Sequence, residues 1–254
     1  MSTSLADTAS QPSARRELIA PLWHTTVFVL FVLIYAFFER TKVSRLESQH
    51  ITSRVPLYLF MIGFELVLVC YVWFLGVKPA GGSFLSLVGG QWKTVGDVLR
   101  DIGIAFVFWM VVITMLVGLR VVLGQNPQML RAARIVSPQN TQEMILWACV
   151  ALAAGTCEEF VFRGYLQKQF QAITGSDVAA VGLQAVVFGA AHSYQGVKGM
   201  ITITVYGALF GILAVYRKSL RPGMIQHVMQ DTSAGIIGAL FLKRLGKTPA
   251  IFFF

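Results

Sequence analysis

Ionisable side chains stand at three places within the apolar second half of the chain. They are Glu158, Glu159 and Arg163; His192; and His227 with Asp231. Charge inside a bilayer is costly, and ionisable residues retained there usually serve a function. Carboxylates and imidazoles are also the groups that most often activate water and move protons. The pattern therefore indicates a site of chemistry among membrane-embedded helices.

The first group lies in "GTCEEFVFRG", residues 155–164. Glu159 and Arg163 are four residues apart, in the order that favours an ion pair on one helix face. Neighbours on a helix point about 100° apart, so Glu158 faces elsewhere and remains an unpaired acid. The spacing predicts a structural role for Glu159 and Arg163 and a general base in Glu158. The alternative is a solvated, salt-bridged helix end at the membrane interface.

The second group is His192, which follows Phe188 by four residues in "FGAAHS". A turn at about 173–177 separates it from Glu158, with about 14 residues of helix on either side. At about 1.5 Å per residue, both side chains lie about 21 Å from the turn. We therefore expect them at one depth on neighbouring antiparallel helices. The alternative is a buried histidine bonded to a backbone carbonyl.

The third group is "HVMQD", in which His227 and Asp231 again share one helix face. An imidazole and a carboxylate at this spacing can orient a water, bind a metal with further ligands or stabilise an oxyanion. The alternative is a private hydrogen bond between the two. His227 follows Pro222 by only five residues, which predicts a position nearer one membrane face than His192.

The composition points to an integral membrane protein. Of 254 residues, 56% are hydrophobic and 13% are charged, and the mean hydropathy is +0.66. One soluble core of this size could not hide so much apolar surface. The net charge of +9 is spread over loops and both ends, without basic runs interleaved with aromatics, so nucleic-acid binding is not expected. Cys70, Cys149 and Cys157 lack CxxC spacing and are interpreted as small core residues.

The apolar segments predict an all-α, polytopic membrane bundle of about seven to eight transmembrane helices around an intramembrane polar cavity. They fall at about 18–38, 55–77, 102–123, 143–157, 178–192, 199–216 and 222–242. The fourth segment looks short, but its helical character continues to about residue 172, which would place Glu158 midway along one long helix. Asp177 is the expected N-cap of the following helix.

The chain divides into four regions. Residues 1–17 form a polar and mobile N-terminus, 18–142 an N-terminal transmembrane region, 143–242 a catalytic transmembrane region, and 243–254 a C-terminal tail. The first apolar run continues to Phe38 without a small-residue cleavage site, so a retained helix is expected rather than a signal peptide.

Three further ionisable residues receive no catalytic role. His24 and His50 lie near segment ends or in a loop and are interpreted as interfacial. Glu65 stands alone in the second segment, where it could face the cavity.

In their order, the three motifs EExxxR, FxxxH and HxxxN/D resemble those of the CPBP intramembrane proteases. This family is also called Abi and includes the CAAX prenyl endopeptidases. The resemblance covers about residues 143–242, roughly the last two-fifths of the chain. It implies a helical membrane fold with a polar cavity and hydrolysis of a peptide bond. It implies Glu158 as the general base, assisted by His192, with His227 and Asp231 holding or polarising the scissile carbonyl.

The resemblance leaves the cofactor open, because family members are often labelled metalloproteases while a metal-free glutamate mechanism is also argued. The candidate ligands of a divalent metal such as zinc are His192, His227, Glu158 and Asp231, and we lean towards no tightly held metal. The last motif position is often Asn in the prenyl-processing enzymes, and here it is Asp231. An ionised Asp would repel an oxyanion, so Asp231 must be protonated, orient His227 or ligate a metal.

The expected partners are the lipid bilayer and a peptide or protein substrate, in a bacterial plasma (inner) membrane. The substrate, its cleavage site and the oligomeric state are left open. Two alternatives to a protease remain: a non-proteolytic binding or bacteriocin-immunity protein of the same fold, and a transporter or proton channel that uses the buried acids.

Overall fold

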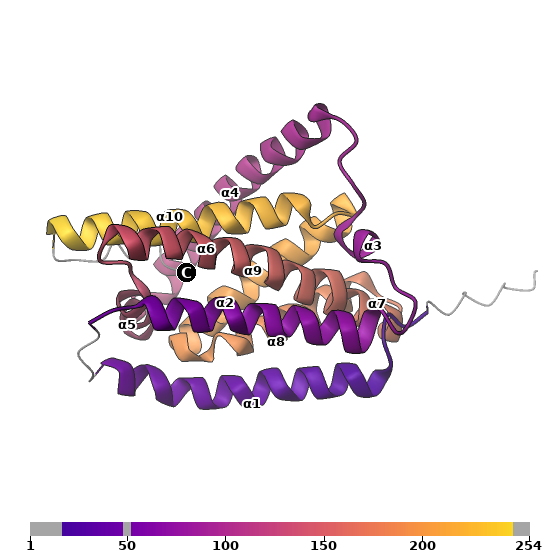
Figure 1. The fold of residues 1–254 in the computed structure, drawn as a ribbon, viewed down its shortest axis with the longest axis horizontal. Helices are drawn as coiled ribbons and strands as arrows, with labels where there is room; N and C mark the ends of the chain where they lie inside the picture. Colours follow the sequence, from indigo (N-terminus) through magenta and orange to yellow (C-terminus); the bar gives the residue numbers. More distant parts are fainter. Residues whose placement is uncertain (1–16, 48–51, 246–254) are drawn as a thin grey trace, which may run out of the picture.

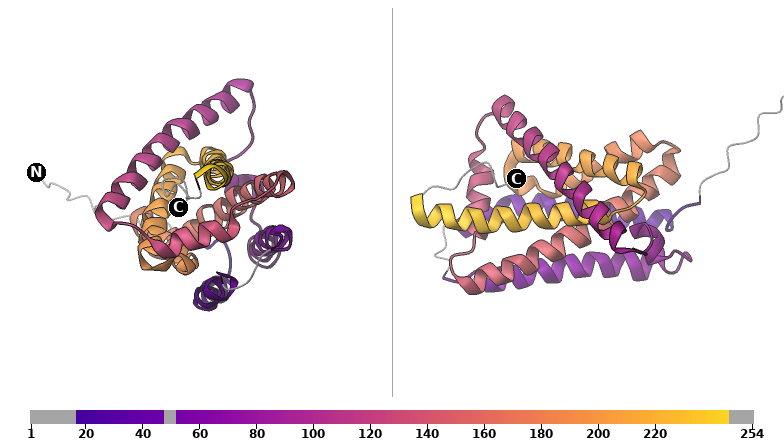
Figure 2. Two further views of the ribbon diagram at one scale, coloured as in Figure 1. Left: turned by 90° about the vertical axis from the view of Figure 1, so that its left-hand side faces the viewer. Right: turned by 90° about the horizontal axis from the view of Figure 1, so that it is seen from above.

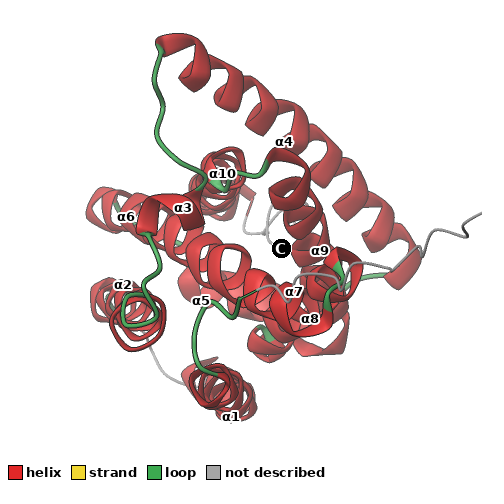
Figure 3. Cartoon of the chain, turned by 90° about the vertical axis from the view of Figure 1, so that its right-hand side faces the viewer, coloured by secondary structure: helices red, strands yellow, loops and turns green. Residues whose placement is uncertain are grey.

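The computed structural model describes residues 17–47 and 52–245. Within these ranges the chain contains helices, turns and loops but no strand (Figure 3), which confirms the all-α prediction. The helices are α1 (Leu22–Glu47), α2 (Val55–Cys70), η1 (Tyr71–Val77), α3 (Phe84–Val88), α4 (Val95–Leu123), α5 (Pro127–Val136), α6 (Thr141–Glu158), η2 (Glu159–Leu166), α7 (Gln167–Thr174), α8 (Asp177–Ala191), η3 (Ser193–Gln195), α9 (Gly196–Arg217) and α10 (Arg221–Leu245). The polar N-terminus and most of the C-terminal tail, as well as His50, lie outside the described residues.

Five helical segments of the described chain are long and apolar enough to cross a membrane. They are Leu22–Glu39, Val55–Val77, Val95–Leu123, Thr141–Thr174 and Ser193–Arg217, while α8 is apolar but shorter. Large apolar side chains cover the outside of these helices; Val121 and Val122 on α4, for example, are each 80% exposed. A surface of this kind requires lipid, and it supports an integral membrane protein. The count of seven to eight crossings stays a prediction.

The helix α6 lies at the centre of the bundle. It packs against α10 on one side and α2 on the other, and Figure 1 shows the three running side by side. Helices α8 and α9 pack extensively on each other and, through α8, against α1. Helix α4 slants across the outside of the bundle, where it contacts α9 and α10 (Figure 2).

The fourth span is one continuous helix over Thr141–Thr174, as the sequence predicted, and it changes character midway. After Glu158 the backbone winds as a π-helix through Leu166, with i→i+5 hydrogen bonds such as that from Gln167 N to Phe162 O. Such turns are rare in proteins and occur frequently at functional sites. Glu158 and Glu159 therefore stand at the junction of two helical geometries.

Specific hydrogen bonds fix the starts of helices α8 and α10. The N-cap of α8 is Ser176, whose Oγ accepts a hydrogen bond from Ala179 N at 3.3 Å. The prediction of Asp177 was wrong by one residue; Asp177 occupies the first turn, where its charge favours the helix dipole. Before α10, Leu220 N donates to Val88 O at 2.9 Å, so the turn into α10 is tied to the end of α3.

Candidate active site

Glu159 holds the first and third polar groups together. Its Oε1 accepts a hydrogen bond from Arg163 Nη1 at 2.8 Å, the i,i+4 pair that the spacing predicts, and it also lies 3.1 Å from His227 Nδ1. Both Glu159 and Arg163 are 1% exposed. An acceptor beside Nδ1 assigns the proton of His227 to that nitrogen. Glu159 thus fixes the histidine as well as neutralising the arginine.

Arg163 is enclosed by aromatic rings on helices α8 and α9. Its guanidinium carbon lies 4.3 Å from the ring centre of Phe188 and 5.2 Å from that of Phe210. Its Nη2 donates to the carbonyl oxygen of Gly207 at 3.4 Å. Cation–π contacts in a desolvated setting contribute about 2 kcal/mol. Phe188 therefore contacts Arg163 as well as His192.

The second nitrogen of His227 faces two carboxylates. Nε2 lies 3.8 Å from Glu158 Oε2 and 3.7 Å from Asp231 Oδ2, beyond direct hydrogen-bond distance. The side chain of His227 is 6% exposed, whereas those of Glu158 and Asp231 are 14% and 27% exposed. Glu158 has no cation of its own helix beside it, in contrast to Glu159.

His192 stands at the end of α8 rather than within a helix. It is the C-cap residue, and its Nδ1 lies 2.9 Å from the carbonyl oxygen of Phe188. The hydrogen bond to a backbone carbonyl, which the sequence analysis gave as the alternative to a catalytic role, is therefore present. That bond fixes the ring, because a carbonyl can only accept and Nδ1 must carry the proton. Nε2 of neutral His192 then bears a lone pair.

One cavity of about 150 Å³ is lined by Glu158, His192, His227 and Asp231 together. The four side chains come from α6, the end of α8, and α10. A second cavity of about 210 Å³, mostly apolar, adjoins the first and shares Glu158 and His192 with it. Glu65 on α2 lines this second cavity, as the sequence allowed, and its Oε2 is buried without a hydrogen-bond partner.

Close contact between α6 and α10 brings His227 beside the first group of polar residues. A side chain at Gly155 would meet Val228 N at 2.7 Å, and one at Gly164 would meet Leu220 Cδ1 at 3.0 Å. The two helices therefore run antiparallel in close register, and small residues allow this approach. His227 reaches Glu158 and Glu159 because the start of α10 lies against the π-helical part of the fourth span.

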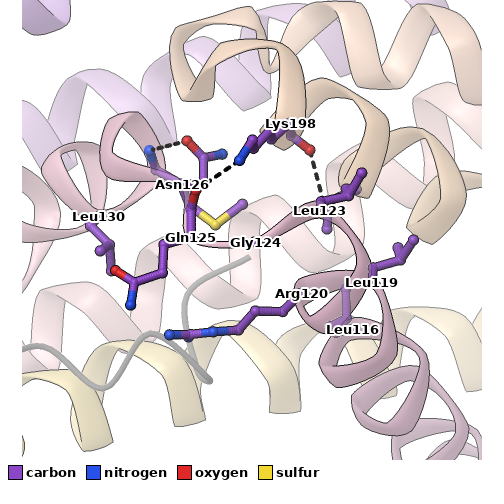
Figure 4. Close-up of a pocket in the computed structure, with 11 residues that line it drawn as sticks. Leu116, Leu119, Arg120, Leu123, Gly124, Gln125, Asn126, Leu130 and Lys198 are labelled. Atoms are coloured by element: carbon purple, nitrogen blue, oxygen red, sulfur yellow. Dashed lines mark hydrogen bonds between the residues drawn. The ribbon is translucent and has the colours of Figure 1, made fainter.

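The turn that follows His192 is held by the connection between α4 and α5 (Figure 4). Asn126 accepts a hydrogen bond from Met129 N at 3.3 Å and donates one to Gln195 O at 3.0 Å. Lys198 Nζ donates to the carbonyl oxygen of Gln125 at 3.1 Å. The small pocket at this joint contains none of the predicted site residues. Its polar contacts anchor the segment that carries His192.

Two expectations about histidine and cysteine are corrected. His24 is not interfacial but 0% exposed, with Nδ1 2.8 Å from Tyr165 Oη, because α1 packs against the buried fourth span. The three cysteines are free, yet only Cys157 is buried; Cys70 and Cys149 face outward. In a membrane an outward thiol meets lipid, so the hydrophobic pattern alone could not separate the two environments.

Tyr206 on α9 is a cavity residue that the sequence did not single out. It lines the same cavity as the four predicted residues, and its ring centre lies 5.6 Å from that of His227. A lone tyrosine in an apolar helix carries no motif, so only the fold could reveal it.

The candidate metal ligands do not form a ligand group. Among the described residues, no set of three or more His, Cys, Asp and Glu side chains is arranged to hold a metal ion. The Nδ1 atoms of His192 and His227 are engaged by the Phe188 carbonyl and by Glu159, which leaves both Nε2 atoms free to ligate. As they are arranged, however, these side chains do not bring together the three or four ligands of a usual zinc site.

Comparison with known proteins places this cavity within a recognised segment. Searches of curated proteins and of solved structures found no match. Residues 140–233 match a family model described as "Type II CAAX prenyl endopeptidase Rce1-like". The matched segment contains the three motifs and all four residues that share the cavity. The resemblance drawn from the motifs is thereby confirmed: over residues 140–233 the chain is similar to the CAAX prenyl endopeptidases.

Proposed function

We propose that the chain is an intramembrane endopeptidase that hydrolyses a peptide bond of a membrane-associated peptide or protein. The observation that carries this proposal is the convergence of Glu158, His192, His227 and Asp231 on one cavity. The match to the type II CAAX prenyl endopeptidases over the same residues supports it. We place the site within the bilayer, because Glu158 lies midway along a membrane-length helix.

Glu158 is the proposed general base. Unlike Glu159 it forms no ion pair with an arginine of its own helix, and its partly exposed carboxylate borders the cavity. A water held in the cavity by Glu158 would give a proton to the carboxylate while its oxygen attacks the scissile carbonyl carbon. The carbon–nitrogen bond then breaks, and the proton passes from Glu158 to the leaving nitrogen. We propose that the lone pair on His192 Nε2 assists that transfer, since both residues line one cavity.

His227 is the proposed orienting group for the water. Glu159 fixes its Nδ1, so its Nε2 is presented to the cavity between Glu158 and Asp231. Asp231 in turn is held by its backbone, whose carbonyl oxygen accepts a hydrogen bond from Trp147 Nε1 at 2.8 Å. The chemistry we propose therefore uses protein groups and water, and no step requires a metal.

The adjoining apolar cavity supports a substrate that approaches from the lipid. It is lined by residues of α1, α2 and α5 and shares Glu158 and His192 with the catalytic cavity. An apolar segment beside the scissile bond would lie there. We propose a bacterial inner membrane as the location, on the basis of the resemblance alone.

Cleavage by purified protein in liposomes tests the proposal. The probes are fluorogenic peptides with CAAX ends, with and without a farnesyl group, and unmodified apolar peptides. We expect Glu158→Gln to lower kcat by about 10²- to 10⁴-fold, the usual contribution of a general base. Glu17→Gln, at an exposed position, is the matched control. Equal rates for wild type and Glu158→Gln would refute the protease and favour a binding or immunity role.

A further inference from the structure

The catalytic cavity is rich in hydrogen-bond acceptors and poor in donors. Glu158 and Asp231 accept only, when ionised. His192 and His227 each carry their proton on Nδ1, bonded to the Phe188 carbonyl and to Glu159, so their neutral forms present Nε2 as a lone pair. A tetrahedral intermediate of amide hydrolysis requires donors at its oxyanion. In their neutral forms the two histidines supply none, and a protonated His227 supplies one through Nε2.

Most other donors that line the cavity are already engaged. Trp147 Nε1 donates to the backbone carbonyl of Asp231 at 2.8 Å. Gln195 Nε2 donates to Tyr194 Oη at 3.2 Å. Two tyrosine hydroxyls remain: that of Tyr194 accepts the hydrogen bond from Gln195, whereas that of Tyr206 has no partner at all among the described residues.

The hydroxyl of Tyr206 has no hydrogen-bond partner among the described residues, although it is buried. The whole residue is 4% exposed, and its ring is held by Phe210, at 4.5 Å between ring centres, as well as by His227. A buried hydroxyl left without a partner costs about 1–3 kcal/mol, and such groups in native structures call for an explanation. A ligand in the cavity would supply the missing partner.

We propose that the Tyr206 hydroxyl donates a hydrogen bond to the oxyanion formed at the scissile carbonyl, an inference that rests on the proposed protease function. When water adds to the carbonyl carbon, the π electrons move to the carbonyl oxygen, and Tyr206 O–H stabilises the resulting negative charge. The bond weakens when the carbonyl re-forms and the amine leaves. Tyr206 remains protonated throughout, so water and amide are converted to acid and amine without loss or gain of atoms.

Tyr206→Phe tests the inference because it removes one oxygen and keeps the ring. Tyr194→Phe is the matched control, since it deletes the other tyrosine hydroxyl of the same cavity. Both are measured with the most active peptide of the panel, in full-length protein in liposomes. We expect Tyr206→Phe to lower kcat about 100-fold with little change in KM, as for loss of one oxyanion donor. Tyr194→Phe should stay within about 3-fold of wild type.

Two further measurements separate a catalytic hydroxyl from a structural one. A peptide aldehyde, which binds as a tetrahedral hydrate, should lose affinity for Tyr206→Phe by the same factor as kcat, while the corresponding amide should not. The thermal midpoint should stay constant or rise, because an unpartnered buried hydroxyl has been removed. A lowered midpoint, an effect on KM alone, or an equal loss in Tyr194→Phe would overturn the role of Tyr206.

The outcomes distinguish this inference from the proposed function. Glu158-dependent cleavage with full kcat in Tyr206→Phe would overturn the inference and leave the protease intact. Absence of Glu158-dependent cleavage of every probe would overturn the protease, and the inference with it.

Discussion

His227 Nδ1 lies 3.1 Å from Oε1 of Glu159, although 68 residues separate them in the chain. The same oxygen accepts a hydrogen bond from Arg163. One carboxylate thus neutralises an arginine on its own helix and sets the ring orientation of a histidine on another. The structural and the catalytic parts of the site meet at a single atom.

Arg163→Met should destabilise the protein more than removal of both charges. The single substitution leaves Glu159 buried without its cation, which costs about 3–5 kcal/mol. The double substitution Glu159→Gln and Arg163→Met removes the uncompensated charge and should recover a large part of that loss. Thermal unfolding in detergent measures the difference.

Arg100→Met is the control for loss of an arginine, since that side chain is 50% exposed and its ion pairs contribute little. Purely additive effects of the two buried substitutions would contradict the coupling.

Gly155→Ala should lower both stability and kcat. The added methyl group would lie 2.7 Å from Val228 N and 3.2 Å from the carbonyl carbon of His227, so α10 must move away from α6. We expect a loss of about 1–3 kcal/mol from overpacking and a weaker contact between His227 and Glu159. Denaturation and cleavage assays on the same preparation measure the two effects.

Gly182→Ala on α8 is the matched control, because nothing lies within 4 Å of its added methyl group. It should be neutral or slightly stabilising, as alanine favours helix by about 1 kcal/mol over glycine. Similar losses of stability and kcat in Gly155→Ala and Gly182→Ala would show that the register of α6 and α10 does not cause them.

Asp231→Asn should preserve or increase kcat. The Oδ2 atom stands 3.7 Å from His227 Nε2, and an amide there removes a negative charge from the cavity and adds a donor for an oxyanion. Asp231→Leu also removes the charge but adds no donor, and it should lower kcat at least 10-fold. Loss of activity in the asparagine variant equal to that in the leucine variant would mean that the carboxylate itself is required.

Chelation should leave cleavage intact. The described residues contain no group of three or more side chains arranged as metal ligands, so 1,10-phenanthroline should not change kcat. Activity measured before and after dialysis against the chelator, with metal content determined in parallel, provides the test. Loss of activity that returns on addition of zinc would contradict this prediction and require a different arrangement of His192 and His227.

The contacts that depend on helical spacing could be predicted from the sequence. Glu159 with Arg163 and His227 with Asp231 follow from residues four apart, and the continuous helix over Thr141–Thr174 follows from sustained periodicity. These are local properties of one helix.

The remaining contacts required the tertiary structure. The bond from His227 to Glu159 depends on the register that Gly155 permits between two helices. The burial of His24 could not be predicted, because the packing of α1 against Tyr165 leaves no periodic signal in the sequence. The cavity position of Tyr206 has no signature in the sequence for the same reason.

The ion pair between Glu159 and Arg163 also bears on biogenesis. Both residues belong to one uninterrupted span, so their charges can cancel as soon as that helix forms, before any later segment is synthesised. A translocating segment with paired charges enters hydrocarbon at lower cost than one whose counter-ion must come from a different helix. The span could therefore partition into lipid on its own, and His227 would join a carboxylate already in place.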